Sequence, residues 1–129
     1  MNFTIGTCFK NTNTPPPPQH YWFVLSEPTA AKNVIIANIT SWSDSCDDAS
    51  CRLKNGDHSC ILKDCYVNYG DAKLVGLGIL ENLLQTKLVV IYEKACDDLL
   101  QLMQQGALES EHCKNWAKKI LRSQNLPRL

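Results

Sequence analysis

Side chains that could transfer protons lie at the ends of several predicted strands in the first half of the chain. Residues 34–39 form an apolar run that ends in Thr40 and Ser41, and a Gly56-Asp57 turn precedes His58. Imidazole groups exchange protons near neutral pH, and hydroxyl, ammonium and carboxyl groups can assist them. If the strands close into a barrel, these groups would surround one pocket. The candidate catalytic residues are His20, Thr40, His58, Lys63 and Asp71.

A second group of side chains could bind a substrate near these residues. Aromatic rings provide stacking surfaces, while hydroxyl and amide groups form hydrogen bonds. The candidate binding residues are Ser41, Trp42, Tyr66, Asn68 and Tyr69. A purely structural interpretation also holds for each residue taken singly, because rings often pack in cores and hydroxyls often cap strand ends.

The seven cysteines leave several kinds of chemistry open. Their odd number argues against a complete disulfide framework. Cys46 and Cys51, and Cys60 and Cys65, form two evenly spaced pairs with His58 between them. The four-residue gaps lie at the wide end of the spacings of zinc ligands, so these four cysteines could be free, disulfide-bonded or zinc-bound. We otherwise expect no metal and no cofactor.

Charge and missing motifs exclude several classes of function. Thirteen basic residues balance thirteen acidic ones, so no overall field attracts nucleic acid and any such binding must be local. The sequence has no phosphate-binding loop, no dinucleotide fingerprint, no zinc-protease motif and no nucleophile elbow. It also lacks an apolar run that could span a membrane and the features of a secretory signal, so we expect a cytoplasmic protein without membrane contact.

The hydrophobic pattern predicts strands first and helices afterwards. Alternation over residues 3–9, aromatic and β-branched residues at 20–25, and the apolar run at 34–39 predict three strands. The prolines at 15–18 predict a loop. Residues 61–63 could form a short strand, and residues 65–69 and 72–77 predict the last two. Short strands with brief connections suggest a small barrel.

After Gly78 the period becomes helical. Leu80 and Leu84 belong to a short amphipathic helix, and a longer one, including Tyr92, ends near Gly106. Residues 113–121 show the clearest helical spacing. We therefore predict one α+β domain over residues 1–129, mainly β, with a barrel at 1–77 and a helical part at 78–125 packed on it.

Two blocks of sequence resemble a known family. The segment from His20-Tyr21-Trp22-Phe23-Val24-Leu25-Ser26 through Val34-Ile35-Ile36-Ala37-Asn38-Ile39-Thr40-Ser41 is similar to the second and third strands of PemK/MazF-like toxins. Gly56-Asp57-His58 and Tyr66-Val67-Asn68-Tyr69-Gly70-Asp71-Ala72-Lys73 resemble blocks of a divergent bacterial subgroup. The similarity covers roughly residues 3–125.

The resemblance implies an SH3-like β-barrel with C-terminal α-helices and a bacterial toxin of a toxin–antitoxin system. It implies a metal-independent endoribonuclease that cleaves single-stranded RNA. As partners we expect an RNA substrate and an antitoxin protein, and a homodimer is left open. Thr40 matches the family's threonine at the end of the third strand, and Asp71 lies near its acidic residue.

The family's catalytic arginine has no counterpart in this chain. Its position falls near Asn68, or in the early loop where the chain has Lys10. Lys63 or Lys73 could supply the positive charge, without the bidentate geometry of arginine. His20 and His58 could instead act as an acid and base pair. The alternative function is a catalytically silent SH3-like barrel that binds protein or nucleic acid through its aromatic residues, namely Trp22, Trp42, Tyr66 and Tyr69.

Overall fold

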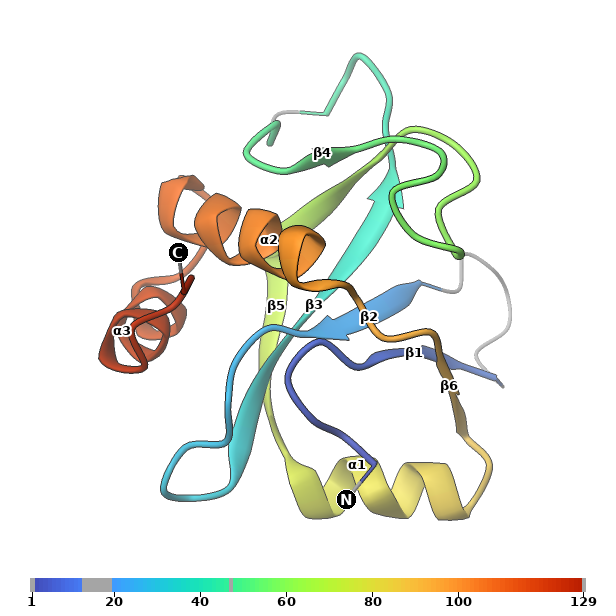
Figure 1. The fold of residues 1–129 in the computed structure, drawn as a ribbon, viewed down its shortest axis with the longest axis vertical. Coiled ribbons are helices and arrows are strands. Elements are labelled where there is room, and N and C mark those ends of the chain that lie inside the picture. The colour runs from blue at the N-terminus through green and yellow to red at the C-terminus, as the bar shows by residue number, and fades with distance from the viewer. Residues whose placement is uncertain (1, 13–19, 47, 129) are drawn as a thin grey trace.

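The computed structural model describes residues 2–12, 20–46 and 48–128 (Figure 1). In these segments six strands form one antiparallel sheet in the order β4-β5-β3-β2-β1-β6. The elements along the chain are β1 (Cys8–Asn11), β2 (Tyr21–Val24), β3 (Asn33–Ser41), β4 (Arg52–Leu53), β5 (Cys65–Gly76), α1 (Leu77–Gln85), β6 (Val89–Tyr92), α2 (Asp97–Glu109) and α3 (Asn115–Ser123). The predicted α+β class, mainly β, is confirmed.

Strand β3 lies inside the sheet and is buried on both faces. Ile35 and Ala37 belong to the core on one face, and Val34 and Ile36 belong to the core on the other. Successive side chains of a strand point to opposite faces. The continuous apolar run of the sequence is therefore explained by helices on both sides of the sheet.

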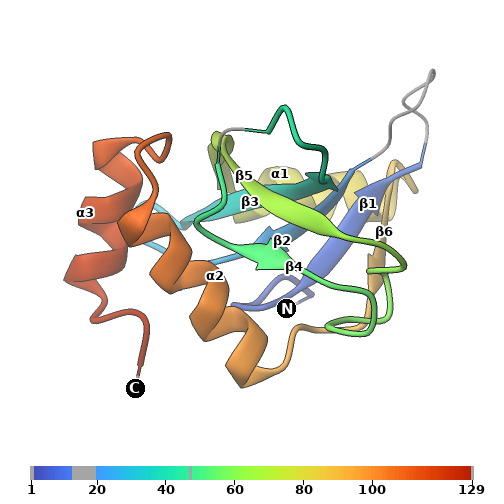
Figure 2. The same cartoon turned by 90° about the horizontal axis from the view of Figure 1, so that it is seen from above.

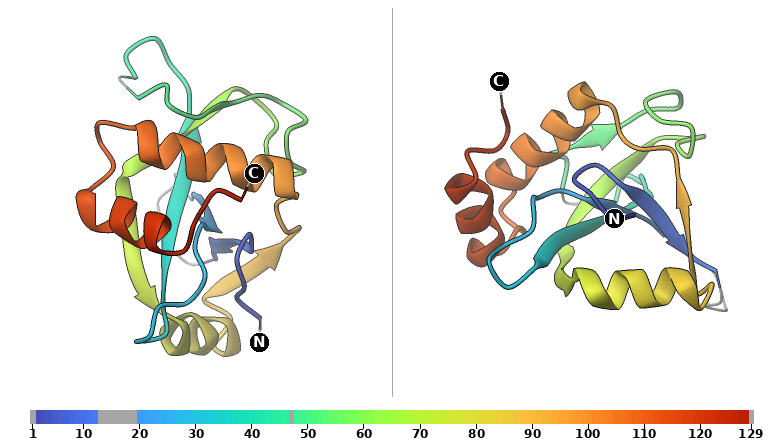
Figure 3. Two further views of the ribbon diagram at one scale, coloured as in Figure 1. Left: turned by 60° about the vertical axis from the view of Figure 1, so that its left-hand side comes forward. Right: turned by 60° about the horizontal axis from the view of Figure 1, so that its bottom comes forward.

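The helices cover opposite faces, as the views in Figures 2 and 3 show. On one side, Leu80 of α1 packs with Phe3 and Phe9. On the other side, α2 and α3 pack on the larger core. Two hydrogen bonds fix α2 there: the Tyr69 hydroxyl donates to the Met103 carbonyl at 2.6 Å, and the buried Gln104 amide donates to the Leu25 carbonyl at 2.8 Å.

The sheet is curved but open. Ile36 lies opposite Lys73 whereas Asn38 lies opposite Asn68, so β5 has extra residues between these two pairs. Irregularities of this kind bend a strand. The edge strand β4 has two residues and pairs with β5, and no pairing of β4 with β6 is found in the described part of the chain. The open sheet does not confirm a closed SH3-like barrel.

Several predicted boundaries were wrong. The first strand begins at Cys8 instead of residue 3, because a turn from Thr4 to Thr7, with Gly6 at φ +90°, precedes it. Residues 61–63 form no strand, and residues 65–77 contain one long strand followed by α1 where two strands were predicted. Tyr92 lies in β6, which pairs with β1, so residues 78–125 contain a strand as well as helices. The predicted loop at residues 15–18 lies outside the described residues.

Candidate functional site

One end of the sheet has a cavity of about 850 Å³. Its walls come from β1, the start of β2, the end of β3, and the loop that leads into β5. The lining residues are Lys10, His20, Tyr21, Ile39, Thr40, Ser41, Cys60, Ile61, Leu62, Lys63 and Cys65. Two lysines and no Asp or Glu occur among these described residues, so the pocket favours an anionic ligand.

Strand register explains why distant residues meet in this pocket. Lys10 of β1 lies opposite Tyr21 of β2, and Tyr21 lies opposite Ile39 of β3. On the other side of β3, Ser41 lies opposite Cys65 of β5. The last residues of β1 and β3 and the first residues of β2 and β5 therefore lie at the same edge of the pocket end of the sheet.

His20 lines the pocket and is the candidate general base there. Its Nδ1 lies 3.3 Å from the carbonyl oxygen of Ile39. A carbonyl oxygen only accepts hydrogen bonds, so we assign the proton of the neutral ring to Nδ1. That tautomer leaves the lone pair of Nε2 available as a base.

Thr40 and the two lysines supply the other polar groups of the pocket. The Thr40 hydroxyl donates to Oδ1 of buried Asn38 at 3.3 Å, which orients the threonine side chain. The Lys10 ammonium lies 5.1 Å from the centre of the Tyr21 ring, within the range of a cation–π interaction. Lys63 is exposed at the rim. These positive charges could stabilise charge that develops on a bound phosphate.

Two of the predicted catalytic residues do not line this pocket. The His58 side chain is only 2% exposed, and its ring packs edge-on against Phe23 at 5.3 Å. Its Nε2 donates to the carbonyl oxygen of Glu93 at 2.6 Å. Asp71 is exposed on β5 and accepts a hydrogen bond from the Asn68 amide at 3.2 Å. The structure therefore brings His20, Thr40 and Lys63 together without His58 or Asp71.

The predicted binding residues also divide into groups. Ser41 lines the pocket, whereas Tyr69 is buried beneath α2, where burial raises the pKa of its hydroxyl well above the usual value. Next to Ser41 in the chain, the Trp42 ring contacts the Tyr66 ring edge-on at 5.7 Å. The Arg52 guanidinium lies 4.2 Å from the centre of the Trp42 ring. Trp42, Tyr66 and Arg52 thus form an aromatic and cationic group.

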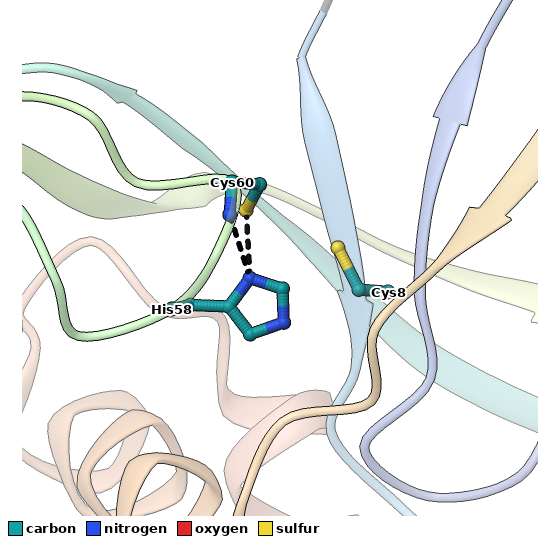
Figure 4. Close-up of side chains that lie close together, drawn as sticks. All are labelled: Cys8, His58 and Cys60. Atoms are coloured by element: carbon teal, nitrogen blue, oxygen red, sulfur yellow. Dashed lines mark hydrogen bonds between the residues drawn. The ribbon is translucent and has the colours of Figure 1, made fainter.

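A cluster of Cys8, His58 and Cys60 lies beside the pocket (Figure 4). One potential ligand atom from each residue lies within 4.8 Å of the other two. His58 Nδ1 is 3.1 Å from Cys60 Sγ and also accepts the Cys60 backbone N–H at 3.1 Å. Cys60 lines the pocket, whereas Cys8 and His58 are buried. The cluster therefore joins β1 to the loop that forms one wall of the pocket.

The two thiols of this cluster differ in acidity. The hydrogen bond with Cys8 lowers the pKa of Cys60, against the opposing effect of burial. The pKa of Cys8 is raised, first by the same hydrogen bond and then by burial. Cys60 is consequently the thiol that more readily becomes a thiolate, the form that binds metals.

The spacing of the four cysteines, Cys46, Cys51, Cys60 and Cys65, left them open as free, disulfide-bonded or zinc-bound. Within the described residues, the group that could hold a metal ion is Cys8, His58 and Cys60. Cys51 and Cys65 are buried in the main core as free thiols, where burial raises the pKa of Cys51 to about 11 and that of Cys65 to about 12. Chain spacing drew attention to His58 and Cys60 but missed Cys8. Cys8 lies in β1, about 50 residues earlier in the chain.

Sequence reasoning also missed Tyr21 and Cys60 as lining residues, and considered Lys10 only as a replacement for an arginine. Lys10 follows Cys8 and Phe9 in β1, a position with no chemical motif. The pairing of β1 with β2, which places Lys10 near His20, is a long-range contact that no sequence motif indicates.

No helix in the described segments is both long enough and apolar enough to cross a membrane. No family model, curated protein or solved structure matches the chain.

Proposed function

We propose that this protein is a metal-independent endoribonuclease, the toxin of a toxin–antitoxin pair, and that it cleaves single-stranded RNA in the pocket of His20, Thr40 and Lys63. The observation that carries the proposal is the lining itself. A histidine, three hydroxyls and two lysines from distant parts of the chain share one cavity whose described lining contains no carboxylate. The resemblance to PemK/MazF-like toxins independently supports the same chemistry.

In the proposed reaction, Nε2 of His20 accepts the proton of a ribose 2′-hydroxyl. The 2′-oxygen then attacks the adjacent phosphorus, and the bond from phosphorus to the 5′-oxygen breaks. The leaving oxygen takes a proton from the Lys63 ammonium. Lys10 and the Thr40 hydroxyl stabilise the negative charge of the phosphorane. The products are a 2′,3′-cyclic phosphate and a 5′-hydroxyl.

Two structural features support RNA as the ligand. The pocket is large enough for a nucleotide, since ligand sites commonly measure about 300–1,000 Å³. The group of Trp42, Tyr66 and Arg52 adjoins Ser41 in the sheet and offers rings and a guanidinium on which bases could stack. We assign this group to a nucleotide that flanks the cleaved bond.

We further propose that the curved sheet is an SH3-like barrel left open between β4 and β6. An antitoxin would inhibit the enzyme by inserting an acidic segment into the lysine-bearing pocket.

The direct test is RNA cleavage by the purified full-length protein without added divalent metal. We expect single-stranded RNA to be cleaved, and His20→Gln to reduce kcat/KM by about 10²–10⁴, the contribution usual for a general base. His112→Gln, which changes a histidine outside the pocket lining, is the matched control and should retain full activity. Unchanged cleavage by a folded His20→Gln variant would exclude the proposed mechanism.

Binding without catalysis is the second candidate function, and the Trp42–Tyr66–Arg52 group favours it. In that case the wild-type protein would bind single-stranded RNA without cutting it. A Trp42→Ala variant would weaken binding, while His20→Gln would leave both binding and the RNA unchanged.

A further inference from the structure

The cluster of Cys8, His58 and Cys60 has the composition of a site for a thiophilic metal ion. Two sulfur atoms and one imidazole nitrogen converge from β1 and from the loop before β5 (Figure 4). Zinc combines cysteine and histidine ligands in this way, with three protein ligands and a water molecule in many sites. The RNA cleavage proposed above requires no such ion, so the two proposals are independent.

The histidine already has the tautomer that a metal needs. The Nε2–H group donates to the Glu93 carbonyl at 2.6 Å, so the lone pair belongs to Nδ1. That lone pair faces Cys60, whose Sγ is 3.1 Å away. Metal-bound histidines commonly donate their other ring N–H to a backbone carbonyl, which fixes the ring orientation. Binding would replace the hydrogen bond from the Cys60 backbone N–H to Nδ1 with a metal bond.

The spacing of the three ligand atoms also fits. Tetrahedral zinc, with bonds of about 2.3 Å to sulfur and about 2.0 Å to nitrogen, places its ligand atoms roughly 3.5–3.8 Å apart. The three atoms lie within 4.8 Å of one another. Small rotations of the cysteine side chains would therefore be enough to form the site, without moving the backbone of β1.

We propose that Cys8 Sγ, His58 Nδ1 and Cys60 Sγ bind one zinc ion, with a water molecule from the adjoining pocket as the fourth ligand. The ion would link β1 to the loop at residues 54–64. Much of this loop is held by contacts within itself, such as the bond from the Ile61 N–H to the His58 carbonyl at 2.9 Å. Zinc would consequently fix the pocket wall that carries Ile61 and Lys63.

The test uses the full-length protein, reduced and treated with a chelator that is then removed. We expect it to take up one zinc ion per chain, to unfold at a higher temperature with zinc, and to show a thiolate-to-cobalt charge-transfer band when Co²⁺ replaces zinc. Loss of a residue that only hydrogen-bonds to a metal ligand lowers metal affinity by about 10–100-fold. Cys60→Ser and His58→Gln remove ligands themselves, so each should weaken zinc binding by more than that. Cys8→Ala, a small apolar change in the core, should do the same.

Cys96→Ser is the matched control because Cys96 is an exposed cysteine outside the cluster, and its zinc affinity should equal that of the wild type. A reduced protein that binds neither zinc nor cobalt would overturn the proposal. Binding that survives Cys8→Ala but is lost in Cys51→Ser would overturn it too, in favour of a site formed by the evenly spaced cysteines. The three readouts are independent of RNA cleavage, so failure of either proposal leaves the other to be tested by its own measurement.

Discussion

At the scale of single residues, the positive charges of the pocket come from two lysines, and none of its described lining residues is an arginine. A lysine offers a point charge instead of a planar pair of donors, so it neutralises phosphate without fixing its orientation. Lys10 is held over Tyr21 by a cation–π contact, whereas Lys63 is exposed at the rim. We therefore assign phosphate binding to Lys10 and the mobile proton to Lys63.

Lys63→Gln should lower kcat more than it raises KM, because the proton donor acts only in the transition state. Lys119→Gln, on the exposed side of α3, is the control and should leave both quantities unchanged. If Lys63→Gln and Lys119→Gln gave the same kcat and KM, Lys63 would have no role in the reaction.

Tyr69 shows how a residue chosen for binding serves the core instead. Its hydroxyl is buried and donates to the Met103 carbonyl. Tyr69→Phe should therefore reduce the free energy of unfolding by about 0.5–1.5 kcal/mol, the usual net value of such a bond. Urea denaturation measures the effect, with Tyr92→Phe on the exposed edge strand as the control. A loss no larger than that of the control would show that the hydroxyl does not anchor α2.

At the scale of elements, Gly106 sets how closely α2 approaches the sheet. A Cβ atom there would lie 2.8 Å from Cys51 Cβ and 3.1 Å from the Ser50 carbonyl, and it would overlap the Tyr69 hydroxyl. The absence of a side chain thus lets the helix pack directly on Tyr69 and the turn before β4. Helix propensity alone would favour alanine at this position.

Gly106→Ala should destabilise the protein by about 1–3 kcal/mol, as overpacking of a core does. Gly78→Ala in α1 is the matched control, because nothing lies within 4 Å of its added Cβ. That substitution should stabilise the protein by about 0.4–1 kcal/mol. Thermal or urea unfolding distinguishes the two, and a stabilising Gly106→Ala would contradict the close packing described for α2.

Sequence patterns predicted some elements well and others poorly for identifiable reasons. The apolar run of β3 and the helical spacing of α3 are long and regular, and both elements were found. β6 is a four-residue apolar segment, and periodicity cannot distinguish so short a run from part of a helix. The continuous β5 was predicted as two strands because Gly70 and Asp71 resemble a turn, and in the structure both lie in the irregularity between the two parts of β5 that pair with β3.

At the scale of the whole molecule, the candidate site depends on pairings between distant segments. Residue types at strand ends predicted that His20, Thr40, His58, Lys63 and Asp71 would share a pocket. The structure places His20, Thr40 and Lys63 in one and leaves His58 and Asp71 outside its lining. The roles of Lys10 and Cys8 could not be predicted, because they follow from the position of β1 beside β2 and near the loop at 58–60. Sequence spacing carries no information about such pairings.

The chemistry of the RNA ends tests the central claim most directly. We predict that mass spectrometry of an oligoribonucleotide incubated with the purified protein, without added divalent metal, will find fragments that end in a 2′,3′-cyclic phosphate and begin with a 5′-hydroxyl. A matched substrate with 2′-deoxyribose at the cleaved position should stay intact, because it lacks the attacking hydroxyl. Intact RNA after prolonged incubation with the folded protein, or fragments with 3′-hydroxyl and 5′-phosphate ends, would contradict the account.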